Sequence, residues 1–376
     1  MAHTFVTPTM VARDAAITLH DRLVTGSLVS RDVEPMFTAS KIGQTVKVTA
    51  PGTFTAREFS GTTSADDSTE NEVDVELAKH YYNRVDLTTA QKSFELSDLT
   101  RLVIVPIMDG IADAIDSFFI DQMVAGFARN VYGTDGGRPS SVAHIVGARK
   151  VLQDAKVRRE GRVGLVDTTV EASFLQINQF TSGDYGQDGP PALREAMIAR
   201  RFGLDWYTDA NCGTFDRGDI AGTVLTDGVP VLAATTVHLD GFTAAVSTIN
   251  KGTRFTVAGD TQIYTVTADI TTAGNEADIP IYPGVSADLV IAGNDAAVTF
   301  KAAFTENLLY HPAAVAAAIV APDPLSGGNS ARQTYNNVSV RVSMDSSIVT
   351  LSDSLVIDVF TGINVVQPTG GVVFQA

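Results

Sequence analysis

The chain contains a single cysteine, Cys212, so an intramolecular disulfide is impossible and a cysteine-ligated zinc site has almost no basis. The histidines share no spacing that is typical of a metal site; they are His3, His20, His80, His144, His238 and His311. Because no motif places a histidine beside Cys212, this residue is predicted to be a buried or partly buried thiol rather than a nucleophile. The sequence therefore predicts no metal and no cofactor.

Long hydrophobic runs are also missing. The most apolar stretches, "LVIVPIM" and "AAVAAAIVA", fall well short of the roughly 20 residues that a membrane-spanning helix needs. The first residues, "MAHTFVTPTMVARDA", do not combine a cationic region with an apolar run, so no signal peptide is predicted. We expect a soluble protein that is made and kept in a cytoplasm-like compartment, without a membrane partner.

Basic residues are scarce: 27 Lys and Arg face 43 Asp and Glu, giving a net charge of −16. Such a chain repels nucleic-acid phosphates on average and would need a local basic stripe to bind DNA. The one modest basic cluster contains Lys156, Arg158, Arg159 and Arg162. We interpret it as a solvated helix end.

Motifs of catalysis are absent, including H-E-x-x-H, the nucleophile elbow, the Walker loop and G-x-G-x-x-G. The glycine-rich segment at 132–141 lacks a Lys-Ser/Thr ending, which favours a linker turn over an anion site. The acidic run from Asp66 to Asp74 lacks EF-hand spacing, which favours a solvated loop over a calcium site. Arg217-Gly218-Asp219 is interpreted as a chance tripeptide. No catalytic residue is predicted, and the chain is not expected to be an enzyme.

The first part of the chain predicts a helical arm followed by an extended ribbon. Pro8 can begin a helix, and Val11, Ala15, Leu19 and Leu23 recur every four residues as a narrow apolar stripe. Residues 41–95 instead show two strand-like alternations around an acidic centre. Because a short helix and an isolated ribbon are each marginal in water, we expect both to need a partner surface.

A long helix is predicted from Asp98 to Gly126, with Pro106 kinking or dividing it. The chain then mixes helices with short strands such as "GRVGLVD". Residues 221–300 carry short β-branched runs without helical periodicity, including a hairpin around Ala258-Gly259-Asp260, and predict a small barrel or sandwich. "NLLYHPAAVAAAIVAPDP" is predicted to return to helix, and two long strands end the chain.

The order of these parts resembles the major capsid proteins of tailed bacteriophages. The likeness is carried by "SSVAHIVGARKVLQDAKVRREGRVGLVDTTVEASFL", by "AMIARRFGLDWYTDANCG", and by "AFTENLLYHPAAVAAAIVAPDPLSG" with the closing strands. The resemblance implies an α+β chain with the Hong Kong 97-type fold, in the branch with an inserted β-barrel. The implied parts are an arm at 1–40, an extended loop at 41–95, peripheral and axial domains at 96–220 and 301–376, and an inserted domain at 221–300.

By this resemblance the chain is a coat protein that self-assembles into the icosahedral phage head around double-stranded DNA. Identical subunits in hexamers and pentamers are the implied partners, with scaffolding, portal and decoration proteins and sequence-independent DNA. The implied location is the virion, after assembly in the host cytoplasm. The expected contacts between subunits are Phe54, Arg57, Glu58, Phe59, Asp66 and Asp67. Alternatives are a decoration or tail component, a cargo-enclosing shell and an enzyme of unrecognised type.

Overall fold

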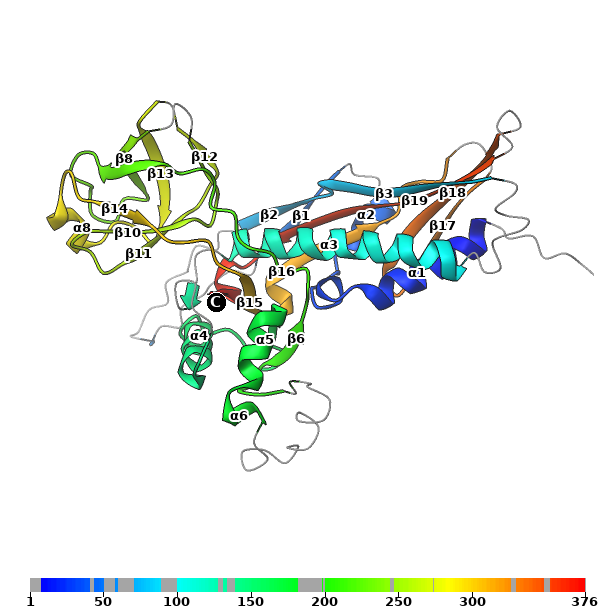
Figure 1. Ribbon diagram of the computed structural model, residues 1–376, viewed down its shortest axis with the longest axis horizontal. Helices are drawn as coiled ribbons and strands as arrows, with labels where there is room; N and C mark the ends of the chain where they lie inside the picture. Colours follow the sequence, from blue (N-terminus) through cyan, green and yellow to red (C-terminus); the bar gives the residue numbers. More distant parts are fainter. Residues whose placement is uncertain are drawn as a thin grey trace, which may run out of the picture. The chain divides into compact units, whose positions relative to one another are not determined.

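The structure is a computed structural model that describes residues 8–40, 44–50, 58–59, 71–88, 100–127, 131–133, 139–181, 198, 200–243, 247–272, 274–325, 329–347 and 352–375. The chain divides into two compact units (Figure 1). The first combines Met1–Phe119 with Val315–Gln367, and the second combines Ile120–Ala314 with Pro368–Ala376. These limits differ from the boundaries expected at residues 95, 220 and 300.

An antiparallel sheet organises the first unit. Its central strand β19 (Ser352–Val365) pairs with β16 (Val315–Val320), β18 (Val338–Ser347) and β3 (Lys79–Thr88), and β17 (Ser330–Tyr335) pairs with β18. Val338, Val340 and Val342 of β18 are buried on one face, while Arg341 and Ser343 stand on the other. The two long strands predicted at the end of the chain are confirmed as β18 and β19.

Helix α1 (Pro8–Arg22) packs against strands β17 and β18 of this sheet. Val11, Ala12, Ala15, Ala16 and Leu19 are all buried within the single chain. The partner surface that this helix was expected to need is therefore supplied by its own chain. Its stripe of mostly small side chains fits a helix that lies closely on a sheet. The turn η1 (Thr25–Ser27) and helix α2 (Glu34–Ser40) follow.

The segment expected as one ribbon divides into two structures. Strands β1 (Thr45–Ala50) and β2 (Asn71–Glu76) form an antiparallel ribbon, whereas β3 runs along β19 from Lys79 to Thr88. The ribbon was expected to need a partner surface, and for this last part that surface lies in the same chain, because all ten residues of β3 pair with β19. Val46 and Val75 of the ribbon are also buried.

The predicted long helix is present as α3 (Val105–Gly126), preceded by a π-helical turn, η3 (Thr100–Ile104). Pro106 lies just after this turn, as expected for a residue that lacks an N–H and divides a helix. Residues 98 and 99 lie outside the described residues. Asp116 of α3 is 1% exposed and accepts backbone hydrogen bonds from Val24 and Gly26, both at 2.8 Å. This carboxylate ties the α1–α2 connection to the helix.

The second unit has a mixed sheet in the order β4-β20-β15-β5-β6. These strands are β4 (Val131–Gly133), β20 (Gly371–Gln375), β15 (Glu306–Tyr310), β5 (Val163–Val166) and β6 (Asp205–Thr208). Helices α4 (Val142–Asp154), α5 (Thr168–Leu175) and α6 (Asn178–Thr181) accompany it. The core includes Ile145, Leu152, Phe174, Trp206 and Phe374.

The helix predicted around "NLLYHPAAVAAAIV" is wrong. This stretch forms strand β15, the 3-10 turn η5 (Pro312–Ala314) and strand β16. Every residue of both strands is buried, so neither shows the alternation that identifies a half-exposed strand. A continuous apolar run cannot be assigned to strand or helix by periodicity, and Pro312 separates two strands here rather than beginning a helix.

Residues 222–300 form the expected small β structure (Figure 1). Its main sheet runs β14 (Val298–Phe300), β10 (Arg254–Val257), β11 (Ile263–Val266), β13 (Ala277–Tyr282), β8 (Thr236–Phe242), β7 (Gly222–Thr226). A bridge between Leu225 and Ala297 brings its two edges together, so the sheet closes. β9 (Thr248–Ile249), β12 (Ile270–Thr271) and α8 (Ala287–Ala292) complete it. The predicted hairpin is confirmed, with Phe255 opposite Tyr264.

Candidate functional site

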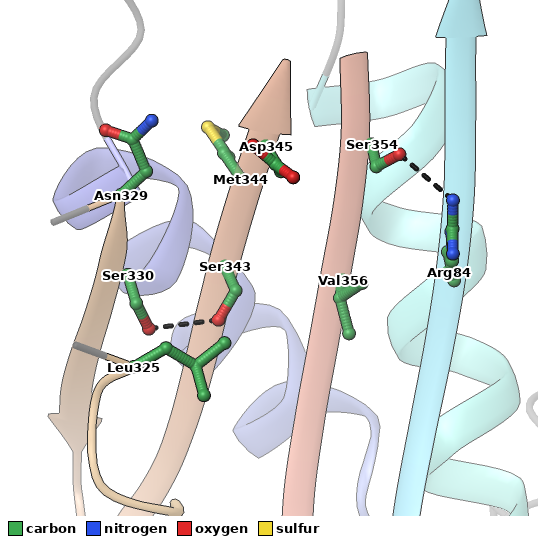
Figure 2. Close-up of a pocket in the computed structure, with 9 residues that line it drawn as sticks. All are labelled: Arg84, Leu325, Asn329, Ser330, Ser343, Met344, Asp345, Ser354 and Val356. Atoms are coloured by element: carbon green, nitrogen blue, oxygen red, sulfur yellow. Dashed lines mark hydrogen bonds between the residues drawn. The ribbon is translucent and has the colours of Figure 1, made fainter. Parts of the chain in front are cut away.

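The polar face of the first unit's sheet carries a hollow of about 390 Å³ (Figure 2). Strand register places Ser330, Ser343, Val356 and Arg84 in one row across β17, β18, β19 and β3. Side chains in one row of a sheet share a face, and the segment after β16 supplies Leu325. The other lining residues are Asn329, Met344, Asp345 and Ser354.

The polar groups in this hollow bind one another. Ser330 and Ser343 share a hydrogen bond of 2.9 Å between their Oγ atoms, and Arg84 Nη2 donates to Ser354 Oγ at 3.2 Å (Figure 2). Hydrogen bonds from Ser354 and then Arg84 lower the pKa of the Asp86 carboxyl. Among the described residues that line the hollow there is no histidine that could activate one of its serines as a nucleophile.

A buried ion pair lies further along the same face. Arg341 Nε donates to Asp358 Oδ1 at 2.8 Å, and Arg341 Nη2 donates to Asp358 Oδ2. Asp358 is 2% exposed, and its Oδ2 also lies 2.9 Å from His80 Nε2. Arg341 Nη1 donates to the carbonyl of Asp323 at 2.7 Å. The bidentate pair thus joins β3, β18 and β19 to the segment after β16.

The residues predicted to contact other subunits fall mostly outside the described residues. Those outside are Phe54, Arg57, Asp66 and Asp67. Glu58 and Phe59 are described and exposed, Phe59 to 72%. Their role stays a prediction. Arg84, a lining residue of the hollow, was missed from the sequence, because it was predicted to lie in the ribbon. The polar alternation of "VSVRVSMD", extended to a neighbouring strand, could have indicated it.

Two buried carboxyl groups were also missed. Glu34 is 6% exposed and its Oε1 accepts a hydrogen bond from Ile319 N at 3.0 Å; burial, which outweighs this bond, raises its pKa to about 8. Glu306 is 4% exposed, and its pKa is raised to about 8. Burial is the larger cause, and the charge of the neighbouring Asp121 is the smaller one. No sequence pattern marks either residue as buried. Both are expected to hold a proton at neutral pH.

Within the described part of the chain, no group of three or more His, Cys, Asp or Glu side chains could hold a metal ion. None of the helices described there combines the length and the apolar character that crossing a bilayer requires.

Comparison with known proteins identifies the fold. No family model and no curated protein matches the chain. Among solved structures, a chain of Mycobacterium phage Che8 is 17% identical with a TM-score of 0.53, covering 94% of this chain and 90% of that chain. The capsid of Ralstonia phage GP4 is 9% identical with a TM-score of 0.52, covering 95% and 90%. The mixed α and β chain therefore shares its fold with phage structures over nearly its whole length.

Proposed function

We propose that this chain is the major capsid protein of a tailed bacteriophage, a structural subunit that assembles with identical copies into a closed shell. The observation that carries the proposal is the fold similarity to the Che8 chain and the GP4 capsid, which spans at least nine-tenths of every chain compared. A match of that extent leaves little of the chain for an added catalytic domain.

The proposed architecture is the Hong Kong 97-type fold with an inserted β-barrel. The two segments that connect the barrel to the rest of the second unit lie side by side, which supports insertion. Phe215 N donates to Phe304 O at 2.9 Å, and the two rings stack with centroids 5.0 Å apart. The Arg254 guanidinium lies 4.4 Å from the centroid of the Phe304 ring. We call these paired segments, residues 214–217 and 302–305, the stem.

The proposed division retains an arm at 1–40, an extended loop at 41–95, peripheral and axial domains at 96–220 and 301–376, and the insert at 221–300. Within it, the β1–β2 ribbon and the exposed Phe59 lie against a neighbouring subunit, together with Phe54, Arg57, Glu58, Asp66 and Asp67. An aromatic side chain that is exposed in the single chain gains most by burial at such an interface. Scaffolding, portal and decoration proteins remain proposed partners, and the virion, assembled in the host cytoplasm, is the proposed location.

Expression of the full chain, followed by gradient sedimentation and negative-stain microscopy, tests the proposal. We expect fast-sedimenting closed icosahedral particles. Monomers under all assembly conditions, trimers or tubes would contradict it, and the last two would favour a decoration or tail component.

Replacing Phe59 with serine tests the proposed contact. We expect the particle yield to fall about tenfold, because an interface anchor is lost. Ile263→Ser is the matched control, since Ile263 is a 45% exposed apolar residue of the barrel outside the proposed contact. Equal yields from both variants would remove Phe59 from the interface while leaving the shell proposal intact.

A further inference from the structure

Basic side chains from separate segments of the second unit gather around the end of helix α4. Between Arg149 and Arg162 the chain holds six basic residues against two acidic ones, in a protein of net charge −16. The guanidinium of Arg149 lies 3.8 to 4.0 Å from where a Cβ of Gly203 would be, and His311 Nε2 lies 3.8 Å from where a Cβ of Gly161 would be. We call the following seven residues the basic cluster: Arg149, Lys150, Lys156, Arg158, Arg159, Arg162 and His311.

Arg162 organises the loop that displays this cluster. Its side chain is 1% exposed, and Nε and Nη2 donate to the carbonyls of Arg158 and Val157, both at 2.6 Å. The residue lies just beneath the surface, covered by the loop that it binds, rather than deep in the core. The turn that follows α4 therefore holds Arg158 and Arg159 in the solvent beside a fixed positive charge.

The two acidic residues of this segment, Asp154 and Glu160, offset only part of the positive charge of the cluster. In the described part of the chain, Arg149, Arg158, Arg159 and Arg162 form no ion pair with a carboxylate. Elsewhere arginines pair with aspartates: Arg22 with Asp109, Arg84 with Asp86, Arg200 with Asp205, Arg332 with Asp323 and Arg341 with Asp358.

The cations of the cluster also repel one another, which affects the pKa of two of its members. Burial, then repulsion from Arg149 and Arg159, lowers the pKa of Arg162. Burial also lowers the pKa of His311, with Arg158 and Arg162 contributing and a hydrogen bond to the backbone of Glu160 opposing. A set of cations that repel one another is stabilised by an external anion.

We propose that the basic cluster binds the phosphate backbone of a nucleic acid. Guanidinium groups hold phosphate oxygens in paired hydrogen bonds, and duplex DNA presents about one negative charge per 1.7 Å of axis, a density that isolated carboxylates on a protein do not match. Lys150, Lys156, Arg158 and Arg159 are the exposed members and make the contacts. Arg162 is a positioning residue. Contact with the backbone alone gives binding without sequence preference.

This inference goes beyond the proposed shell function, because the contact does not require assembly. The test uses dissociated full-length subunits and a short fluorescein-labelled DNA duplex of random sequence, with anisotropy measured over a range of salt concentrations. The double variant Arg158→Glu/Arg159→Glu is compared with Arg22→Glu/Lys251→Glu, which changes the net charge equally at exposed positions outside the cluster.

We expect the cluster variant to lose at least about tenfold in affinity and its log–log salt slope to fall by about 2, since each phosphate contact contributes about 0.9. The control should lose less than about threefold through its altered net charge. Arg158→Lys/Arg159→Lys, which keeps the charge, should retain most of the affinity. Circular dichroism shows whether Arg158→Glu/Arg159→Glu is folded. If it is not, the neutral variant Arg158→Gln/Arg159→Gln replaces it in the binding measurement.

Equal losses in the cluster variant and the control would overturn the inference. Competition by polyglutamate as strong as that by DNA at equal charge would also overturn it, and would indicate an acidic protein segment as the ligand. Particle formation by the same variants, measured by sedimentation, separates the two proposals. Loss of DNA binding with intact particles supports the cluster, whereas DNA binding by a chain that never forms particles counts against the shell function alone.

Discussion

Two regions of the molecule, the polar face of the first unit's sheet and the end of helix α4 in the second unit, treat positive charge in opposite ways. On the first unit's sheet, Arg341 is held by a nearly buried aspartate, Asp358, which also meets His80. In the second unit, Arg162 is covered by backbone carbonyls and surrounded by other arginines. A buried charge that is paired is costly to separate from its partner, because the remaining charge would stay buried alone. A cluster of unpaired cations lowers the free energy of unfolding of the isolated chain through mutual repulsion. Binding of an anionic ligand removes this repulsion.

The largest effect that would sharpen this comparison is expected from Arg341→Ala. The substitution leaves Asp358 buried without its bidentate partner, which should cost about 3–5 kcal/mol of unfolding free energy. Denaturant unfolding monitored by circular dichroism measures it. Arg84→Ala is the control, because Arg84 is 58% exposed in its pair with Asp86 and should cost less than about 1 kcal/mol. Similar losses from both substitutions would refute the distinction between buried and exposed pairs.

A pH dependence of intermediate size is expected from Glu34. Its pKa of about 8 in the folded chain exceeds the ordinary value of 4.5, so the folded state binds the extra proton between these limits. Stability should be greatest below pH 4.5 for this group and fall by up to about 1.4 kcal/mol per pH unit as pH rises towards 8.

Glu34→Gln tests this dependence, because its amide oxygen can still accept the hydrogen bond from Ile319. Unfolding free energies measured between pH 6 and 8 should show a shallower slope in the variant. The slope that remains is assigned to Glu306, whose raised pKa acts in the same direction. An unchanged slope would mean that Glu34 is ionised in the folded chain.

The smallest effect, and the one that tests the comparison most directly, is expected from Arg159→Gln. Removing one repelling charge from beside Arg162 should leave stability unchanged or raise it by less than about 0.5 kcal/mol. Thermal unfolding at low salt is the suitable measurement, because screening at high salt removes the difference. A clear loss of stability would show that the cluster is compensated after all.

Local patterns in the sequence predicted the elements whose two faces differ. The 254–266 hairpin and the closing strands alternate clearly, and the long helix repeats every four residues; all three are present. The helix predicted for residues 306–320 was wrong. Both faces of strands β15 and β16 are buried, so polar and apolar residues do not alternate along them. Local patterns also could not show that β3 pairs with β19, because the partners are separated by more than 250 residues.

The candidate sites were less predictable than the fold, because they depend on what surrounds a side chain. Arg162 was seen in sequence only as one charge among four at a helix end, and its burial depends on how the loop closes over it. Glu34 gave no signal, since its burial comes from β16, which lies far away in the chain. The hollow on the sheet requires the register of four strands at once.

The stem has a consequence for how the chain can change. Because residues 215 and 304 are hydrogen-bonded neighbours, the barrel occupies a position whose two chain connections are already adjacent. We expect that an independently folding domain whose N- and C-termini lie close together could be inserted at this junction without distorting the rest of the second unit. We therefore expect that the segment between the two halves of the stem can be replaced while the remainder of the second unit keeps its fold.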